Sequence, residues 1–399
     1  MAAEKDTWLI DLVGAPASRV GPLVDQVMSW RDDTAPDAEV ILLVDPEAEE
    51  EARRTGLSTI AADTPEEAAK ATSTIGVTRT VALRDIAGIG TQAIQVEPTR
   101  VADARPRLGP PIFVGGTGRC GTWAVGRMIG RHTSITTVHT ELRFHAVPRG
   151  FPAALAGSMT PDEFADSVME RWYEPPGGEG PKGLQLIVAR EELAVALDQF
   201  RERAGDDLPR ALQALMHDLV DPFALKRGAN RWVETTPDNV ASGGFLAKVF
   251  PGAKVIHMVR DGRDAAASVV NLGWGPSNIE DGLEWWARRM KAAQQGVAAM
   301  PANGVEVVRL EELVHFEREK TFQRLVDFLG IDSQPVAAYF ETEMNGDAGH
   351  LGRWRSQVTA EERERINRRY REILAELEEV GTPCLPVDPE RIDEVALSG

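Results

Sequence analysis

The stretch Pro111–Gly130, PIFVGGTGRCGTWAVGRMIG, decides the fold, because it passes from an apolar segment through a glycine-rich turn into a helical pattern. Glycines at positions 115, 116, 118 and 121 permit positive φ angles in the turn. Backbone N–H groups in such a turn, together with the N-terminus of the next helix, form a binding site for a phosphate-like anion. The order strand, loop and helix predicts an α/β domain with a central parallel sheet.

This loop differs from that of nucleoside-triphosphatases, which reads G-x-x-x-x-G-K-[ST]. Counting from Gly116 places Gly121 correctly, but Thr122 stands at the lysine and Trp123 at the magnesium-binding hydroxyl. We therefore expect phosphate binding without a metal ion, with Arg119 as the fixed cation of the loop. A glycine-rich turn that binds nothing is an equally good interpretation of this stretch alone.

A second stretch, Ala253–Leu272, reads AKVIHMVRDGRDAAASVVNL. Its apolar part, Val255–Val259, predicts a buried strand, and the acidic turn at Asp264 predicts the start of a helix. Ligands of open α/β sheets bind at the carboxyl ends of strands. Arg260 at the strand end and Ser268 on the helix could therefore hold one phosphate together, unless Arg260 only stabilises a turn.

Together the two stretches resemble the sulfotransferases that use 3′-phosphoadenosine-5′-phosphosulfate (PAPS) and release adenosine 3′,5′-bisphosphate (PAP). In that family a loop like GGTGRCGT holds the 5′-phosphosulfate, and an element VRDxRDxxxS holds the 3′-phosphate. The resemblance, from Pro110 to the C-terminal helix, is to the branch of the tyrosylprotein sulfotransferases and their bacterial relatives. It implies a three-layer, P-loop-like α/β fold with a central parallel sheet and no metal. The donor-binding residues that it implies are Gly118, Arg119, Cys120, Gly121, Thr122, Trp123, Arg260, Ser268 and Arg353.

The catalytic residues are expected in the segment HTSITTVHTELR, residues 132–143. A short strand at Ile135–Val138 would send His139, Glu141 and Arg143 to one face if the chain stays extended. The Glu-x-Arg pair resembles the family element that carries the catalytic carboxylate, which makes Glu141 the general base and gives Arg143 a positioning role. His139 is the alternative base, since its usual pKa suits proton transfer near neutrality.

Several positions depart from the family pattern. In RWVETTPDNV, residues 231–240, Thr235 stands where the family usually has a lysine, so Arg143 or Arg119 would have to supply that cation, or turnover is impaired. Cys120 and Trp123 replace two hydroxyl residues of the usual loop. The late element GHLGRWR, residues 349–355, would close over the nucleotide with Arg353 or Arg355. The helical pair Trp285 and Trp286 is expected in the core rather than in the site.

Composition limits the function. The formal charge of −18 argues against general binding to nucleic acids or anionic membranes, so a nucleotide must bind in a local basic pocket. Two cysteines are too few for a disulfide framework and suit a reducing compartment. A charged N-terminus and the lack of any run of 18 apolar residues predict a soluble cytoplasmic protein.

The length of 399 residues suggests two domains. Residues 1–106 alternate strands (7–13, 39–44, 57–62, 77–83) with helices (18–30, 46–56, 65–75), which predicts a small parallel α/β accessory domain of unknown role. The Pro- and Arg-rich segment 97–111 is the expected linker. Residues 107–399 would form the sulfotransferase domain.

These observations predict a sulfotransferase that moves a sulfonate from PAPS to an acceptor hydroxyl, or in second place an amine, of a small molecule or natural product. A P-loop kinase or nucleoside-triphosphatase is disfavoured by the missing lysine and hydroxyl. A non-catalytic nucleotide-binding relative stays open because of Thr235, Cys120 and Asp347. A homodimer also stays open.

Overall fold

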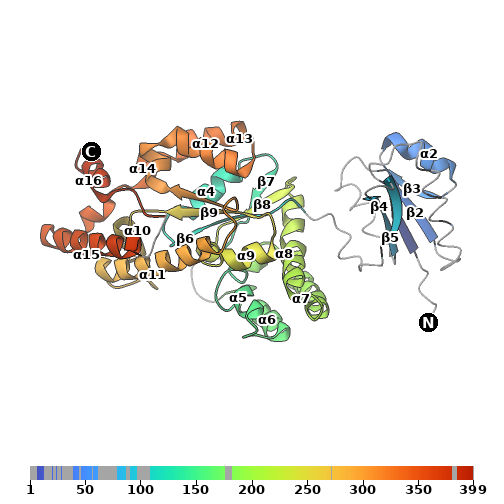
Figure 1. Ribbon diagram of the computed structural model, residues 1–399, viewed down its shortest axis with the longest axis horizontal. Helices are drawn as coiled ribbons and strands as arrows, with labels where there is room; N and C mark the ends of the chain where they lie inside the picture. The colour runs from blue at the N-terminus through green and yellow to red at the C-terminus, as the bar shows by residue number, and fades with distance from the viewer. Residues whose placement is uncertain are drawn as a thin grey trace. The chain divides into compact units, whose positions relative to one another are not determined.

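The structure, a computed structural model, describes residues 7–12, 39–44, 46–55, 57–61, 79–86, 90–96, 108–175, 182–270, 272–379 and 384–398, with positions 20, 24 and 28. The chain divides into two compact units, Met1–Arg107 and Leu108–Gly399 (Figure 1). That the first unit serves as an accessory domain stays a prediction.

The first unit holds a five-stranded sheet of order β3-β2-β1-β4-β5. Its strands are β1 Thr7–Asp11, β2 Glu39–Val44, β3 Ser58–Ala61, β4 Arg79–Ile86 and β5 Gly90–Val96. The four strands expected from sequence are present and parallel, but the antiparallel fifth strand was not predicted. The helix expected over 46–56 appears as a short turn followed by α2 Glu49–Arg54. The helix expected over 65–75 lies outside the described residues.

The second unit is built on a parallel sheet of order β10-β9-β6-β8-β7. Its strands are β6 Ile112–Gly116, β7 Ile135–Thr137, β8 Arg231–Glu234, β9 Lys254–Val259 and β10 Val305–Arg309. The central strand β6 is buried along its whole length, as expected for a parallel strand covered on both faces.

Thirteen described helices surround this sheet. They are α4 Thr122–Ile129, α5 Phe151–Leu155, α6 Pro161–Ser167, α7 Arg190–Ala204, α8 Leu208–Leu225, α9 Gly243–Val249, α10 Gly262–Val270, α11 Ile279–Ala298, α12 Arg318–Leu329, α13 Gln334–Glu343, α14 Gly346–Gly349, α15 Ala360–Glu379 and α16 Pro389–Ser398. Helix α8 has apolar residues recurring at helical spacing along its length, whereas α6 changes to a π-helical turn after Ser167.

The side chains of β6 divide the core into two layers. Ile112 and Val114 pack in a cluster with α4, α12 and α13 on one face of the sheet. Phe113, between them in sequence, points to the opposite face and packs with α7, α8 and α9. Figure 1 shows helices on both faces. The predicted three-layer α/β fold with a central parallel sheet is therefore confirmed.

The topology gathers several loops at one edge of the sheet. Because β6, β8 and β9 are parallel neighbours, the segments that follow Gly116, Glu234 and Val259 all leave at the carboxyl edge. Open α/β sheets bind ligands at this edge. Among the described helices, none is long and apolar enough to cross a bilayer.

Candidate active site

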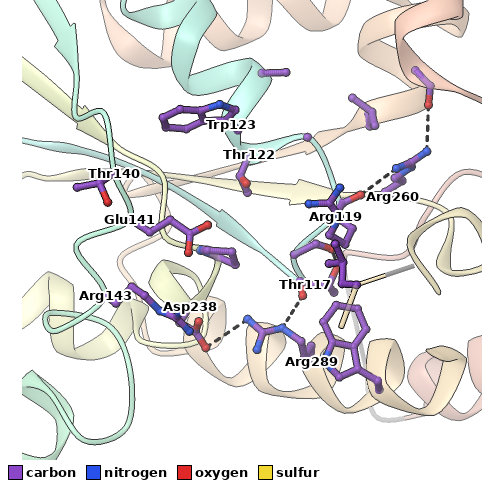
Figure 2. A pocket seen from close by; sticks show the side chains of 18 of the residues that line it. Thr117, Arg119, Thr122, Trp123, Thr140, Glu141, Arg143, Asp238, Arg260 and Arg289 are labelled. Atoms are coloured by element: carbon purple, nitrogen blue, oxygen red, sulfur yellow. Dashed lines mark hydrogen bonds and ion pairs between the residues drawn. The ribbon is translucent and has the colours of Figure 1, made fainter. Parts of the chain in front are cut away.

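A pocket of about 940 Å³ opens at the carboxyl edge of the parallel sheet (Figure 2). Nine of the residues singled out from sequence line it: Gly118, Arg119, Gly121, Thr122, Trp123, His139, Glu141, Arg143 and Arg260. They come from segments that follow three different strands, so only the fold brings them together. Cys120, Ser268 and Arg353 are not among the lining residues.

The loop between β6 and α4 has the backbone shape that its glycines predict. Gly118 and Gly121 have φ angles of 86° and 89°, in the left-handed region that glycine adopts without strain. Arg119 also has a positive φ, 58°, which is uncommon for a residue with a side chain. Gly121 is the N-cap of α4, so the unpaired N–H groups of the first helical turn lie beside the loop.

Arg119 and Arg260 are connected through the loop. One guanidinium nitrogen of Arg260, Nη1, donates to the carbonyl oxygen of Arg119 at 2.9 Å, and Nη2 donates to the carbonyl oxygen of Gly349 at 3.1 Å. Arg119 Nε in turn donates to Ser268 Oγ at 3.0 Å. The residues expected at the two phosphates of the donor are therefore already in contact with one another. Figure 2 shows Arg119 and Arg260 on the same side of the pocket.

Cys120 and Arg353 are placed differently from their neighbours in the motifs. The thiol of Cys120 is fully buried in the apolar cluster between β6 and α4, where burial raises its pKa. Only the backbone of Cys120 is left to face a ligand. Arg353 is exposed in a 3₁₀ turn, while Arg355 pairs with Asp393 at 3.0 Å. The late element does reach the site through Gly349, which lines the pocket.

The wall of the pocket across from Arg119 is formed by residues that follow β7. His139, Glu141 and Arg143 all line it, although Arg143 has a φ of 63° and the segment is not an extended strand. The backbone N–H of Arg143 donates to Thr236 Oγ1 at 3.2 Å, which fixes this conformation. Figure 2 shows Glu141 and Arg143 beside Asp238 and across the pocket from Arg119.

The environment of Glu141 suits a proton acceptor. Glu141 is exposed at the pocket wall, yet the protein atoms around it partly desolvate the carboxyl. The negative charge of Glu234 adds to this effect, so the pKa of Glu141 rises to about 7 although Arg143 opposes the shift. At His139, partial burial and the nearby Arg227 lower the pKa from its usual 6.5. The carboxyl thus titrates at higher pH than the imidazole, the reverse of their ordinary order.

Glu234, at the end of β8, holds the segment with Glu141 and Arg143 in place. It is fully buried and accepts hydrogen bonds from Leu142 N at 3.0 Å, Thr236 Oγ1 at 2.6 Å and Asn239 Nδ2 at 2.7 Å. Its other partner is His145, with Nε2 at 3.1 Å. Burial opposes the charge, but His145 and the hydrogen bonds from Thr236 and Asn239 outweigh it and lower the pKa of Glu234. One ionised carboxylate therefore joins the segments after β7 and β8.

Thr235 does not reach the pocket. Its side chain is buried, its hydroxyl has no partner among the described residues, and its methyl group occupies the space that a side chain on Gly126 would need. A cation that no motif predicted lies on another element: Arg289 of α11 lines the pocket, and its Nη2 lies 3.2 Å from Oδ1 of Asp238. Sequence reasoning missed Arg289 because it belongs to no motif.

A weak signal for Arg289 does exist in the sequence. The buried stripe of α11 includes Leu283, Trp286 and Met290, and Arg289 follows Trp286 by three positions, at the edge of that stripe. A charged residue there must pair or face a cavity. Trp285 also lines the pocket and lies against Trp274, with ring centroids 6.4 Å apart, so the expectation that both tryptophans of this helix are core is correct only for Trp286.

Four arginines and three carboxylates, those of Glu141, Asp238 and Glu343, line the pocket, so it is more basic than the acidic chain as a whole. In the described parts of the chain Arg119, Arg143 and Arg260 have no carboxylate within ion-pair distance. Unpaired guanidinium groups beside helix and loop N–H groups favour a phosphate or sulfate group. Among the residues that the structure describes, no group of three or more His, Cys, Asp or Glu is arranged to hold a metal ion.

Comparison with known proteins identifies relatives. The family model described as "Sulfotransferase family" matches residues 110–335. Protein-tyrosine sulfotransferase 1 from Danio rerio is 28% identical over 247 residues, which are 60% of this chain and 58% of the relative. The chain thus spans little more than half the length of that protein.

Two solved sulfotransferase structures also resemble the chain. The sulfotransferase domain from the curacin biosynthetic pathway matches with a TM-score of 0.37 and 16% identity, covering 61% of this chain and 83% of that domain. A sulfotransferase from Mycobacterium avium matches with a TM-score of 0.38 and 15% identity, covering 71% of this chain and 79% of that protein.

Proposed function

The chain belongs to the sulfotransferase family, and we propose that it transfers a sulfonate group from PAPS to a hydroxyl group of a small-molecule acceptor. The observation that carries this proposal is a carboxyl group with a raised pKa, Glu141, across one pocket from arginines that lack carboxylate partners. A proton-accepting group on one side of a pocket and an anion-binding site on the other suit a reaction between a hydroxyl and an anionic donor.

The residues of the pocket fit the donor. The volume of about 940 Å³ lies within the usual range for small-ligand sites. We propose that the loop N–H groups and Arg119 hold the 5′ end of PAPS, while Arg260, with Ser268, holds the 3′-phosphate. When bound, PAPS supplies a sulfonate that passes to the acceptor oxygen while its bond to the phosphate oxygen breaks.

Glu141 would act as the general base. Its carboxylate accepts the hydroxyl proton as the acceptor oxygen bonds to sulfur, and a pKa of about 7 makes it a stronger base than an ordinary glutamate while half of it is still ionised at neutral pH. Arg143 beside it would hold the acceptor or the sulfonate. Glu234 contributes indirectly, because it fixes the backbone at Leu142 next to Glu141.

Charge stabilisation would come from the loop. Negative charge develops on the phosphate oxygen that leaves, and Arg119 with the N–H groups of the α4 N-terminus would neutralise it. No proton needs to be given to that oxygen, since a phosphate is a stable anion at neutral pH. Catalysis therefore consists mainly of positioning and electrostatics. We include in the proposal a cytoplasmic site of action, supported by two buried, unpaired thiols.

Calorimetry with a chelator present tests the donor. PAP should bind without metal, and ATP should bind poorly, because Trp123 replaces the magnesium-binding hydroxyl. Metal-dependent ATP binding without PAP binding would refute the proposal. Transfer of label from PAPS to a panel of phenols and alcohols then separates an enzyme from a protein that only binds the nucleotide.

A further inference from the structure

Arg289 reaches into the pocket from α11 and joins its two sides. Its Nε donates to the carbonyl oxygen of Thr117 in the phosphate loop, and its Nη2 lies 3.2 Å from Oδ1 of Asp238 on the turn after β8. Figure 2 shows the guanidinium between these two residues, on the same side of the pocket as Asp238 and Arg143. The cation thus lies between the loop that would hold the donor and the segment that carries Glu141.

These two anchors leave part of the guanidinium available. Nη1 has no hydrogen-bond or ion-pair partner within the described parts of the chain, and the side chain is 28% exposed, which means that it faces the pocket rather than the core. The group is also within electrostatic reach of the base, because the positive charge of Arg289 lowers the pKa of Glu141. A guanidinium held at two points loses little conformational entropy when it makes a further hydrogen bond.

No other described cation occupies this position. Arg119 and Arg260 lie on the far side of the loop, where they contact Ser268 and the carbonyl oxygen of Gly349. Arg143 lies next to the ring of Trp172, with the guanidinium carbon 5.9 Å from the ring centroid. The turn after β8 contributes no cation of its own, since Thr235 points toward α4.

We propose that Arg289 is a catalytic residue that binds the transferring sulfonate through Nη1 and supplies the cation that is missing at Thr235. This inference rests on the proposed sulfonate transfer. Asp238 acts as a positioning residue that orients the guanidinium. Arg289 stays protonated throughout and moves no proton, so its contribution is electrostatic only.

The competing explanation is that Arg289 merely ties the phosphate loop to the turn after β8. The two explanations differ in which nucleotide they affect. PAP has both phosphates of the donor but no sulfonate. A contact with the sulfonate should therefore matter for PAPS alone, whereas a loop tie should matter for both nucleotides.

The test measures the dissociation constants of PAPS and PAP by calorimetry with a chelator present. For Arg289→Gln we expect PAPS affinity to fall by about tenfold or more and PAP affinity to change by less than about twofold, because only a charge-assisted hydrogen bond to the sulfonate is lost. Arg288→Gln is the matched control. It removes the same group from the adjacent, exposed position of α11 and should leave both constants unchanged.

An equal loss of affinity for both nucleotides, or no loss for either, would overturn the assignment. Arg289→Lys gives a second measurement if the glutamine variant does not fold. Lysine keeps the positive charge but cannot make both contacts, to Thr117 and to Asp238. Its ratio of PAPS affinity to PAP affinity should therefore lie between that of the wild type and that of Arg289→Gln. Failure of the wild-type protein to bind PAP at all would refute the proposed function itself, so the two failures are distinguishable.

Discussion

The pH dependence of turnover is the sharpest consequence of the site geometry. If Glu141 accepts the proton of the acceptor, the reaction needs its carboxylate form, and the pKa of about 7 places the acidic limb of kcat near neutrality. About half of the enzyme is active at pH 7 and about one tenth at pH 6, so kcat should fall close to tenfold between pH 8 and pH 6. This limb lies far above the ordinary range of a glutamate.

The position of the limb also identifies the base. His139 has a lowered pKa, so a limb that it controlled would lie below 6.5. Arg143→Met removes a cation that favours the carboxylate and should move the limb of Glu141 to higher pH. Glu141→Gln should lose about 10²–10⁴-fold in turnover with PAP affinity retained. His139→Gln should leave both the limb and most of the rate in place.

The assay is transfer of label from saturating PAPS to a fixed phenol between pH 5.5 and 8.5, with PAP affinity measured at each pH. Saturation separates the chemical step from any change in donor binding. A flat profile over this range, or an unshifted limb in the Arg143→Met variant, would show that Glu141 does not act as the base. Full activity of Glu141→Gln combined with an inactive His139→Gln would reverse the two roles.

Three further results are expected. Arg260→Ala should weaken PAP binding by about 1.5–3 kcal/mol in calorimetry, while Arg353→Ala, exposed outside the pocket, should have little effect; equal losses would contradict this placement of the 3′-phosphate. Glu234→Gln should reduce the free energy of unfolding in urea by about 3–5 kcal/mol, because an amide nitrogen would face the donors that the carboxylate accepts. Because the folded-state pKa of Glu234 is lowered, its wild-type contribution is complete above pH 4.5 and is lost as the pH falls through that lower value; stability that is independent of pH there would contradict the pairing with His145. Gly126→Ala should destabilise by about 1–3 kcal/mol, since the new methyl group would lie 2.2 Å from Cγ2 of Thr235, and Thr235→Ser should recover most of the loss in a double-mutant cycle.

The parts of the fold that sequence predicts well are those with strong local patterns. The helix over 208–225 and the strand ending at Val259 follow from apolar periodicity, and Gly118 and Gly121 predict the loop conformation that is found. The antiparallel strand Gly90–Val96 was missed, because its pairing with β4 depends on tertiary contacts in the sheet and leaves no local signal in the sequence. Periodicity predicts that a segment is a strand, but not its direction.

The site shows the same division. Motifs located Arg119 and Arg260, and the short pattern HTELR located Glu141, because each follows a strand whose end is evident in the sequence. A motif does not say which way a side chain points: the thiol of Cys120 packs in the core although its neighbours line the pocket. Arg289 lies outside every motif, and the raised pKa of Glu141 depends first on desolvation by the surrounding protein and then on Glu234, 93 positions later in the chain. Both follow from tertiary contacts alone.

The unpaired arginines of the pocket have a consequence for the rate at which an anionic nucleotide arrives. The chain carries a net charge of −18, so its long-range field repels such a ligand, and only close to the pocket do the guanidinium groups attract it. Salt screens the long-range repulsion and the short-range attraction to different extents. At physiological salt the screening length is about 8 Å, so the repulsion at long distance is weakened more than the attraction inside the pocket. Added salt should therefore slow association less than it does for proteins with a basic surface. An acidic exterior around a basic pocket also keeps polyanions such as nucleic acids from competing for the site.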